Sequence, residues 1–291
     1  MTSKQSGSDL KRLPDCDGLR KLSSSGGVGS NSDDINEAQQ FAYDAWDEPD
    51  RTRRNLLARK ALAHSPLCAD AWLQLSELRN LSDSQRREYL LRAVCAGELA
   101  IGERRFAEAK GDFWLILDTR PYMRARFALA QDLWYSCDRN ERIAAIAHLR
   151  EMLDLNPNDN QGLRYVLLVW LIRTDAYQAA EDMLDKHRDE ISAFMEFTRV
   201  LLAYRTLGDC EKTHEMAAKA YLANRHIPHY LAHSELWHEG SGTYSPGRES
   251  EAAWYAQELG IDWFSTHGAI EWLAHCTDRE PVRNRDGETL H

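Results

Sequence analysis

Four residues in the last third of the chain form its densest histidine cluster: His226, His229, His233 and His238. His229 and His233 stand four residues apart, a spacing that places two imidazoles on one helix face, where they can chelate a transition metal. No HExxH motif accompanies them, and Pro228 interrupts the approach from His226. This favours separate surface or packing histidines, so no metal and no cofactor is predicted. A helical enzyme or metal-binding protein that uses this histidine-rich third is the alternative.

A second group of residues has the chemistry to bind carboxylates. The segment TRPYMRAR brings Arg120, Tyr122, Arg124 and Arg126 together around an expected helix start, with Arg120 just outside the helix. Arginine presents paired N–H donors that match a carboxylate, so the segment could form a cationic and aromatic cradle for an acidic peptide. Ion pairs to the many Asp and Glu residues of neighbouring repeats are the favoured alternative.

The string LNPNDNQGLRY holds the third candidate group. Its Asn and Asp side chains are expected chiefly to cap the next helix by accepting bonds from its free N–H groups. The alternative is that Asn160 and Arg164 project from the first helix of a hairpin into a groove. The candidate peptide-binding residues are Arg120, Arg124, Asn160, Arg164 and Tyr165. No catalytic residue is predicted, because the chain contains no GxSxG elbow, Walker loop or dinucleotide fingerprint.

A helical hairpin that recurs about every 34 residues must position these groups. In its clearest copy, residues 121–157, two apolar-striped helices flank a polar break and a proline closes the unit. Second helices begin after Asp138, Asp175 and Asp209, and small residues share one position in them: Ala145, Ala180 and Thr213. Modules of this size bury their apolar faces by stacking on each other. The predicted fold is therefore all-α, a right-handed superhelix of helical hairpins (an α-solenoid).

Helix boundaries are expected where the apolar periodicity meets a capping or breaking residue. Gly97 and Gly260 are expected to end their helices. Residues 111–120 are either a buried helix or an irregular connector. The other expected helices cover residues 36–46, 51–64, 68–79, 83–97, 98–110, 249–259 and 263–276.

Composition divides the chain into three parts. Residues 1–34 are rich in Ser and Gly and are expected to form a disordered leader; residues 35–276 carry the α-solenoid; residues 277–291 form a flexible charged tail. The net charge of -10 argues against nucleic-acid binding, which needs clustered Lys and Arg. No apolar run approaches the ~20 residues that span a bilayer. Six cysteines without a CxxC pair fit buried free thiols in a cytoplasmic protein.

Four strings carry a family resemblance: ARKALAHSPLCADAW, FWLILDTRPYMRARFALAQDLW, REMLDLNPNDNQGLRY and SPGRESEAAWYAQELG. Across about residues 36 to 276 the chain resembles tetratricopeptide-repeat proteins, and more narrowly bacterial relatives of the suppressor of tumorigenicity 7 family. The resemblance implies a non-catalytic scaffold that binds a protein or peptide through its concave face. Eukaryotic members of the narrower family are membrane-associated, but this chain has no hydrophobic segment, so that property is not expected here.

Overall fold

The computed structural model describes residues 16–25, 29, 31–238 and 243–277. Within these ranges the chain forms fifteen α-helices and two 3-10 helices and contains no strand, so the predicted all-α class is confirmed. Each described helix is too short or too polar to cross a bilayer. The packing divides the chain into an N-terminal unit, Met1–Leu163, and a C-terminal unit, Arg164–His291. The region expected as one domain, 35–276, therefore spans both units.

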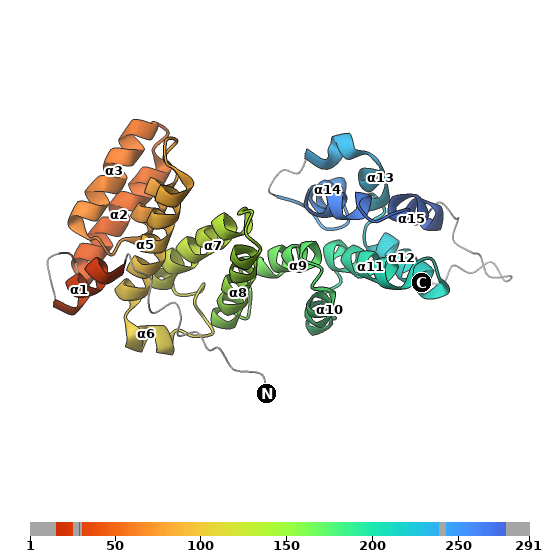
Figure 1. Ribbon diagram of the computed structural model, residues 1–291, viewed down its shortest axis with the longest axis horizontal. Coiled ribbons are helices and arrows are strands. Elements are labelled where there is room, and N and C mark those ends of the chain that lie inside the picture. The colour runs from red at the N-terminus through yellow and green to blue at the C-terminus, as the bar shows by residue number, and fades with distance from the viewer. Residues whose placement is uncertain (1–15, 26–28, 30, 239–242, 278–291) are drawn as a thin grey trace. The chain divides into compact units, whose positions relative to one another are not determined.

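The N-terminal unit consists of helical hairpins packed in chain order (Figure 1). Its helices are α1 (Asp17–Ser25), α2 (Ser32–Asp47), α3 (Arg51–His64), α4 (Ala69–Ser76), α5 (Asp83–Ile101), α6 (Glu103–Glu108), α7 (Arg120–Trp134) and α8 (Arg139–Leu155). α2 packs on α3, α4 on α5 and α7 on α8, and α5 also packs on α7. Buried alanines let α2 and α3 approach closely: Ala38, Ala42 and Ala61.

Capping side chains set the starts of these helices. Asp50 Oδ1 accepts a bond of 2.8 Å from the Arg53 amide, and Asp138 Oδ1 accepts one of 2.7 Å from the Asn140 amide. Ser82 forms a reciprocal capping box with Gln85 at the start of α5. Each cap satisfies an N–H group that the helix itself leaves without a partner, which is why these boundaries were readable from the sequence.

The C-terminal unit encloses an aromatic core. Its helices are α9 (Leu163–Arg173, which begins at the unit boundary), α10 (Tyr177–Lys186), α11 (Ala193–Leu207), α12 (Glu211–Ala223), α13 (Ile227–Ala232), α14 (Glu249–Phe264) and α15 (Ala269–Thr277), with a 3-10 helix at Ser234–His238. α11 packs on α12, α13 on α14, and α15 contacts α12, α13 and α14. Trp263 and Tyr255 are fully buried, and the Trp263 indole N–H donates to the Tyr255 hydroxyl over 2.9 Å.

In the described part of the leader, the structure differs from the expected disorder. Residues 17–25 form α1, and α2 already begins at Ser32. Cys16, which precedes α1, and Leu19 of α1 are buried in one apolar cluster with Leu67, and this burial docks the short helix. Cys16 is joined to Cys95 of α5 by a disulfide, which corrects the expectation that every cysteine is a free thiol. The rest of the leader and residues 278–291 of the predicted tail lie outside the described residues.

Two glycines expected to end helices lie inside them. α5 continues past Gly97 to Ile101, and α14 continues past Gly260 to Phe264. A Cβ at Gly97 would lie 2.9 Å from the Tyr122 Cα, and one at Gly260 would lie 2.7 Å from the Trp237 ring. Both glycines therefore permit close packing within the fold instead of terminating a helix.

The segment after α5 also differs from the expected helix at 98–110. Gly102, with φ 75°, separates α5 from the short α6. Of the segment 111–120, residues 111–119 form the irregular connector rather than a helix, with one 3-10 turn at Leu117–Thr119. Buried Phe113 anchors this connector, and its amide donates to the Leu155 carbonyl over 3.3 Å. Arg120 is the first residue of α7 and not outside it.

Replacing Gly97 by alanine should destabilise the N-terminal unit by about 1–3 kcal/mol, because the added methyl meets the α7 backbone. Alanine gains about 1 kcal/mol in helix propensity over glycine, so the clash must exceed this gain. Gly18→Ala is the matched control, since a Cβ there has no neighbour within 4 Å. Urea unfolding followed by circular dichroism measures both variants. A neutral or stabilising Gly97→Ala would contradict the close approach of α5 and α7.

Candidate functional site

The arginines predicted near the start of α7 bind within the protein. Arg120 Nε donates to the Trp114 carbonyl over 2.7 Å, and its guanidinium lies over the Trp114 ring. Arg124 Nε donates to Asp70 Oδ1 over 3.0 Å, and the Asp70 side chain is fully buried. Because Asp70 belongs to α4 and Arg124 to α7, Arg124 forms an ion pair with a different helical hairpin, as the favoured alternative expected. Burial alone would lower the pKa of Arg124, but its bonds to Asp70 raise it.

The residues after α8 are not brought together in the predicted way. Asn160 is exposed in the turn between α8 and α9, so the expectation that it projects from a helix is wrong. The predicted capping role is confirmed at Asp159, whose Oδ1 accepts from the Leu163 amide over 2.7 Å. Arg164 Nε donates to Glu190 Oε2 over 2.8 Å, and the Tyr165 hydroxyl donates to the same carboxylate. Burial raises the pKa of Glu190, but these bonds outweigh it and the pKa is lowered.

The clustered histidines lie on the surface of the C-terminal unit. The rings of His229 and His233 are 4.2 Å apart, and His233 Nδ1 is 2.8 Å from the His229 carbonyl oxygen. His226 Nδ1 lies 3.8 Å from a Glu249 carboxylate oxygen. In the described part of the chain, no three His, Cys, Asp or Glu side chains are grouped so that they could hold a metal ion.

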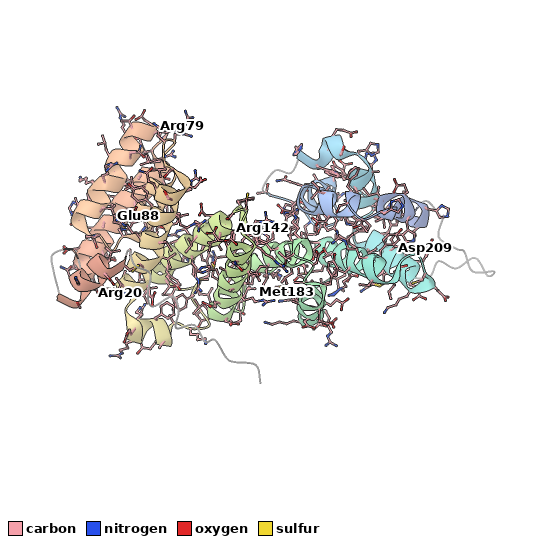
Figure 2. All side chains as sticks on the ribbon, in the orientation of Figure 1. Arg20, Arg79, Glu88, Arg142, Met183 and Asp209 are labelled. Atoms are coloured by element: carbon pink, nitrogen blue, oxygen red, sulfur yellow. A yellow bond between two sulfur atoms is a disulfide. The ribbon has the colours of Figure 1, made fainter. Side chains whose placement is uncertain are left out.

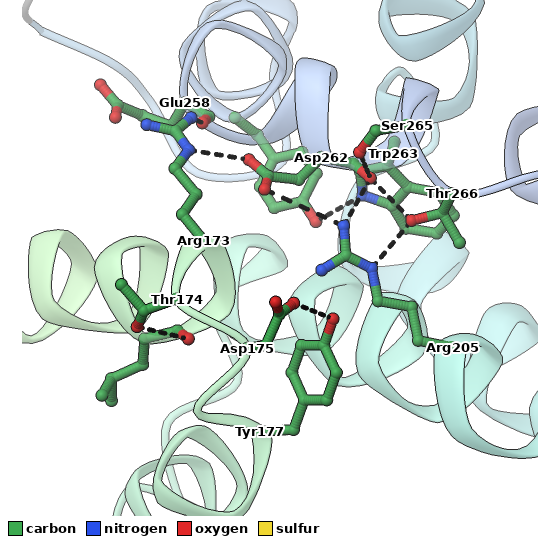
Figure 3. A network of polar contacts seen from close by, with 12 residues as sticks. Arg173, Thr174, Asp175, Tyr177, Arg205, Glu258, Asp262, Trp263, Ser265 and Thr266 are labelled. Atoms are coloured by element: carbon green, nitrogen blue, oxygen red, sulfur yellow. Dashed lines mark hydrogen bonds and ion pairs between the residues drawn. The ribbon is translucent and has the colours of Figure 1, made fainter. Parts of the chain in front are cut away.

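An open polar pocket of about 700 Å³ lies in the C-terminal unit. It is formed where α9 ends, where α10 and α11 face each other, and where α14 ends (Figure 3). The lining residues that carry polar side chains are Arg173, Asp175, Tyr177, Tyr204, Arg205, Asp262, Ser265, Thr266 and His267. Its volume lies within the range of small-molecule and cofactor sites.

Arg205 of α11 is held rigidly at one wall of this pocket. Its Nε donates to Thr266 Oγ1 over 2.8 Å, and its Nη2 donates to the Asp262 carbonyl over 2.8 Å. Its guanidinium lies over the Tyr177 ring, 5.7 Å from the centroid. Figure 3 shows the remaining guanidinium nitrogen directed toward the space between Asp262 and Tyr177. The bonds at two nitrogens therefore fix the guanidinium at the pocket wall before any ligand arrives, and Arg205 also interacts with the Tyr177 hydroxyl.

The Asp262 carboxylate lies between two arginines. Arg173 Nε donates to Asp262 Oδ2 over 3.1 Å, and Arg205 Nη2 is 3.9 Å from Oδ1. Burial raises the pKa of Asp262, although both arginines act to lower it. Arg173 also interacts with the carboxyl of Glu258, so the two arginines at this wall face two carboxyl groups.

The opposite wall supplies an acceptor. Asp175 adopts a left-handed backbone conformation with φ 57° in the turn between α9 and α10. Its Oδ1 accepts from the Tyr177 hydroxyl over 2.6 Å, and Asp175 is exposed to solvent. The pocket thus has arginine side chains and a carboxylate among its lining residues.

Sequence reasoning did not find this pocket. The only signal in the sequence was the polar break at Asp175, which the repeat spacing identified as the start of a second helix. Arg173 lies two residues before it. Arg205 and Asp262 lie on helices far along the chain, and only the packing of α11 on α14 brings them together.

Comparison of the chain with protein-family models, with curated proteins and with solved structures gives no match.

Proposed function

We propose that this chain is a non-catalytic binding module of tetratricopeptide-like helical hairpins, and that the pocket around Arg205 receives an extended peptide segment with an acidic group. Consecutive hairpins that pack mainly on their neighbours support the repeat interpretation. The single observation that carries the ligand class is the guanidinium of Arg205, which is fixed by Thr266 and Asp262 and faces an open pocket.

The chemistry of the two walls suits one orientation of the peptide. A carboxylate or carbonyl of the ligand would accept from Arg205, and a ligand N–H would donate to Asp175. Tyr177 would contribute its ring and its hydroxyl beside both. This proposal moves the binding site away from Arg124 and Arg164, whose side chains already form ion pairs within their own units.

Arg205→Lys should weaken capture of acidic peptides about tenfold or more, because lysine keeps the charge but loses the paired donors. The probe is a peptide array in which each Asp or Glu sequence has an Asn or Gln counterpart, followed by fluorescence anisotropy on the binders. Arg142→Lys is the matched control, since Arg142 is an exposed arginine of α8 that lies over the Trp134 ring (Figure 2).

Thermal melting of both variants separates binding from stability, because Arg205 also supports the end of α14. The proposal would be refuted if acidic and amide peptides bound equally, or if the two Arg→Lys variants behaved alike.

A further inference from the structure

A cysteine, a histidine and an aspartate form a chain of contacts in the C-terminal unit, outside the Arg205 pocket. Cys276 Sγ of α15 lies 3.4 Å from His214 Nδ1 of α12. His214 Nε2 lies 2.6 Å from Asp209 Oδ1, in the turn that precedes α12. The contact between α12 and α15 brings together residues 62 positions apart in the sequence. Figure 2 labels Asp209 at this end of the unit.

The two ring contacts define the roles of the histidine nitrogens. A carboxylate only accepts hydrogen bonds, so the proton of neutral His214 lies on Nε2 and is donated to Asp209. Nδ1 then carries a lone pair directed at Cys276, and the thiol donates to it. A nucleophile next to a base that is oriented by a third group is the arrangement that activates thiols and hydroxyls.

The buried Trp272 of α15 holds the Asp209 carboxylate in place. The Trp272 indole N–H donates to the same Asp209 Oδ1 over 3.2 Å, and the Trp272 ring meets His214 edge-on, with centroids 5.8 Å apart. Trp272 itself packs against the Tyr204 ring, with centroids 4.5 Å apart. The bond from His214, with help from Trp272, lowers the pKa of Asp209, so the carboxylate stays charged and can stabilise an imidazolium.

We propose that Cys276 is a reactive thiol, activated by His214 and oriented by Asp209, that forms mixed disulfides with low-molecular-weight disulfides. His214 Nδ1 takes the proton of the thiol, and the Cys276 thiolate attacks one sulfur of the disulfide. A new S–S bond forms, the original one breaks, and the departing thiolate takes the proton back. Attack on sulfur places the developing charge on the leaving sulfur, so a donor pair for an oxyanion is not required.

The other free cysteines provide internal references. Burial raises the pKa of Cys68 to about 12, which makes it inert, whereas Cys137 is exposed in the N-terminal unit. Cys210 caps α12, where bonds from Thr213 lower its pKa, so its modification must be measured separately. The titratable groups around Cys276 are Asp209 and His214, Tyr204 of α11, and Glu271 and His275 of α15.

The test treats the full-length protein, with its Cys16–Cys95 disulfide intact, with dithiodipyridine and maps each modified cysteine by peptide mass spectrometry over time. At about pH 6 we expect Cys276 to react about fivefold faster than Cys137, because His214 Nδ1 lies 3.4 Å from the Cys276 sulfur and can take the proton of the thiol. His214→Gln should remove this advantage, and the Cys276 rates of the wild type and of His214→Gln should converge above about pH 10, where an ordinary thiol is ionised without the help of a base.

His275→Gln is the matched control, because it removes the neighbouring exposed imidazole and leaves the His214 contact in place. It should change the Cys276 rate less than about twofold. Circular dichroism of each variant reports the fold. The proposal is overturned if Cys276 reacts no faster than Cys137, if His214→Gln and His275→Gln have equal effects, or if the His214→Gln difference persists unchanged at high pH.

Discussion

Replacing Arg124 by methionine is expected to destabilise the N-terminal unit by about 3–5 kcal/mol. The Asp70 side chain is fully buried, and Arg124 supplies its only charge partner in the described part of the chain. Gln39 Nε2 donates to Asp70 over 2.7 Å, but a neutral amide compensates a buried carboxylate only in part. Without the guanidinium, Asp70 would have to remain buried as an uncompensated charge or take up a proton. Urea unfolding followed by circular dichroism measures the loss.

The double variant Asp70→Asn/Arg124→Met is the control for this prediction. It removes both charges together, so most of the stability should return, because the penalty arises from the charge left behind. If Arg124→Met were neutral, the ion pair would contribute nothing and Arg124 would again be a candidate for partner binding. If the double variant were as unstable as the single one, lost packing against the Trp46 ring, 4.8 Å away, would be the cause.

Local features of the fold were predictable because single residues determine them. The helix at Arg51–His64 was expected with the observed bounds, since Asp50 caps its start and Ser65-Pro66 follows its end. The small residues aligned by the repeat spacing are all fully buried: Ala145, Ala180 and Thr213. Caps and periodic faces act within one or two turns of a helix, so they can be recognised without knowledge of the rest of the chain.

Features that depend on distant packing were not predictable in this way. A glycine ends a helix by adopting a left-handed conformation, but it can also sit within a helix where another backbone approaches. Gly97 and Gly260 belong to the second kind, and the residues that show this are Tyr122 and Trp237. The docking of α1 had a similar origin, because its few apolar residues gain a partner only from the cluster around Cys95.

For the candidate sites too, the residue types were readable from the sequence, whereas their partners depend on distant packing. Arg124 and Arg164 were predicted to bind a peptide, and in the structure they form ion pairs with Asp70 and Glu190. An acidic chain offers many internal partners to each arginine, and spacing alone does not indicate which one packing supplies. Arg205 likewise binds groups at the end of α14, yet those bonds leave one of its nitrogens directed into a pocket.

Acidification should destabilise the N-terminal unit through His148. Burial, together with the nearby positive charge of Arg126, lowers the pKa of His148 from 6.5 to about 3. Arg126 Nε donates to His148 Nδ1 over 3.2 Å, so that nitrogen must keep its lone pair in the folded state. Between these two pKa values the unfolded chain binds a proton that the folded chain does not. Stability therefore falls as the pH decreases from about 6.5 toward 3, by up to about 1.4 kcal/mol per pH unit.

His148→Gln isolates this contribution from the carboxylates that titrate in the same range. Glutamine can accept from Arg126 through its carbonyl oxygen and does not titrate. The stability of the wild type relative to this variant should be constant above about pH 7 and should fall by about 2–3 kcal/mol by about pH 4.5, as measured by urea unfolding at each pH. The imidazole NMR signal of His148 should stay unchanged over the same interval. A signal that titrates near pH 6.5, with a pH-independent difference in unfolding free energy, would show that His148 is protonated in the folded protein and that Arg126 takes another partner, such as the Glu151 carboxylate it already contacts.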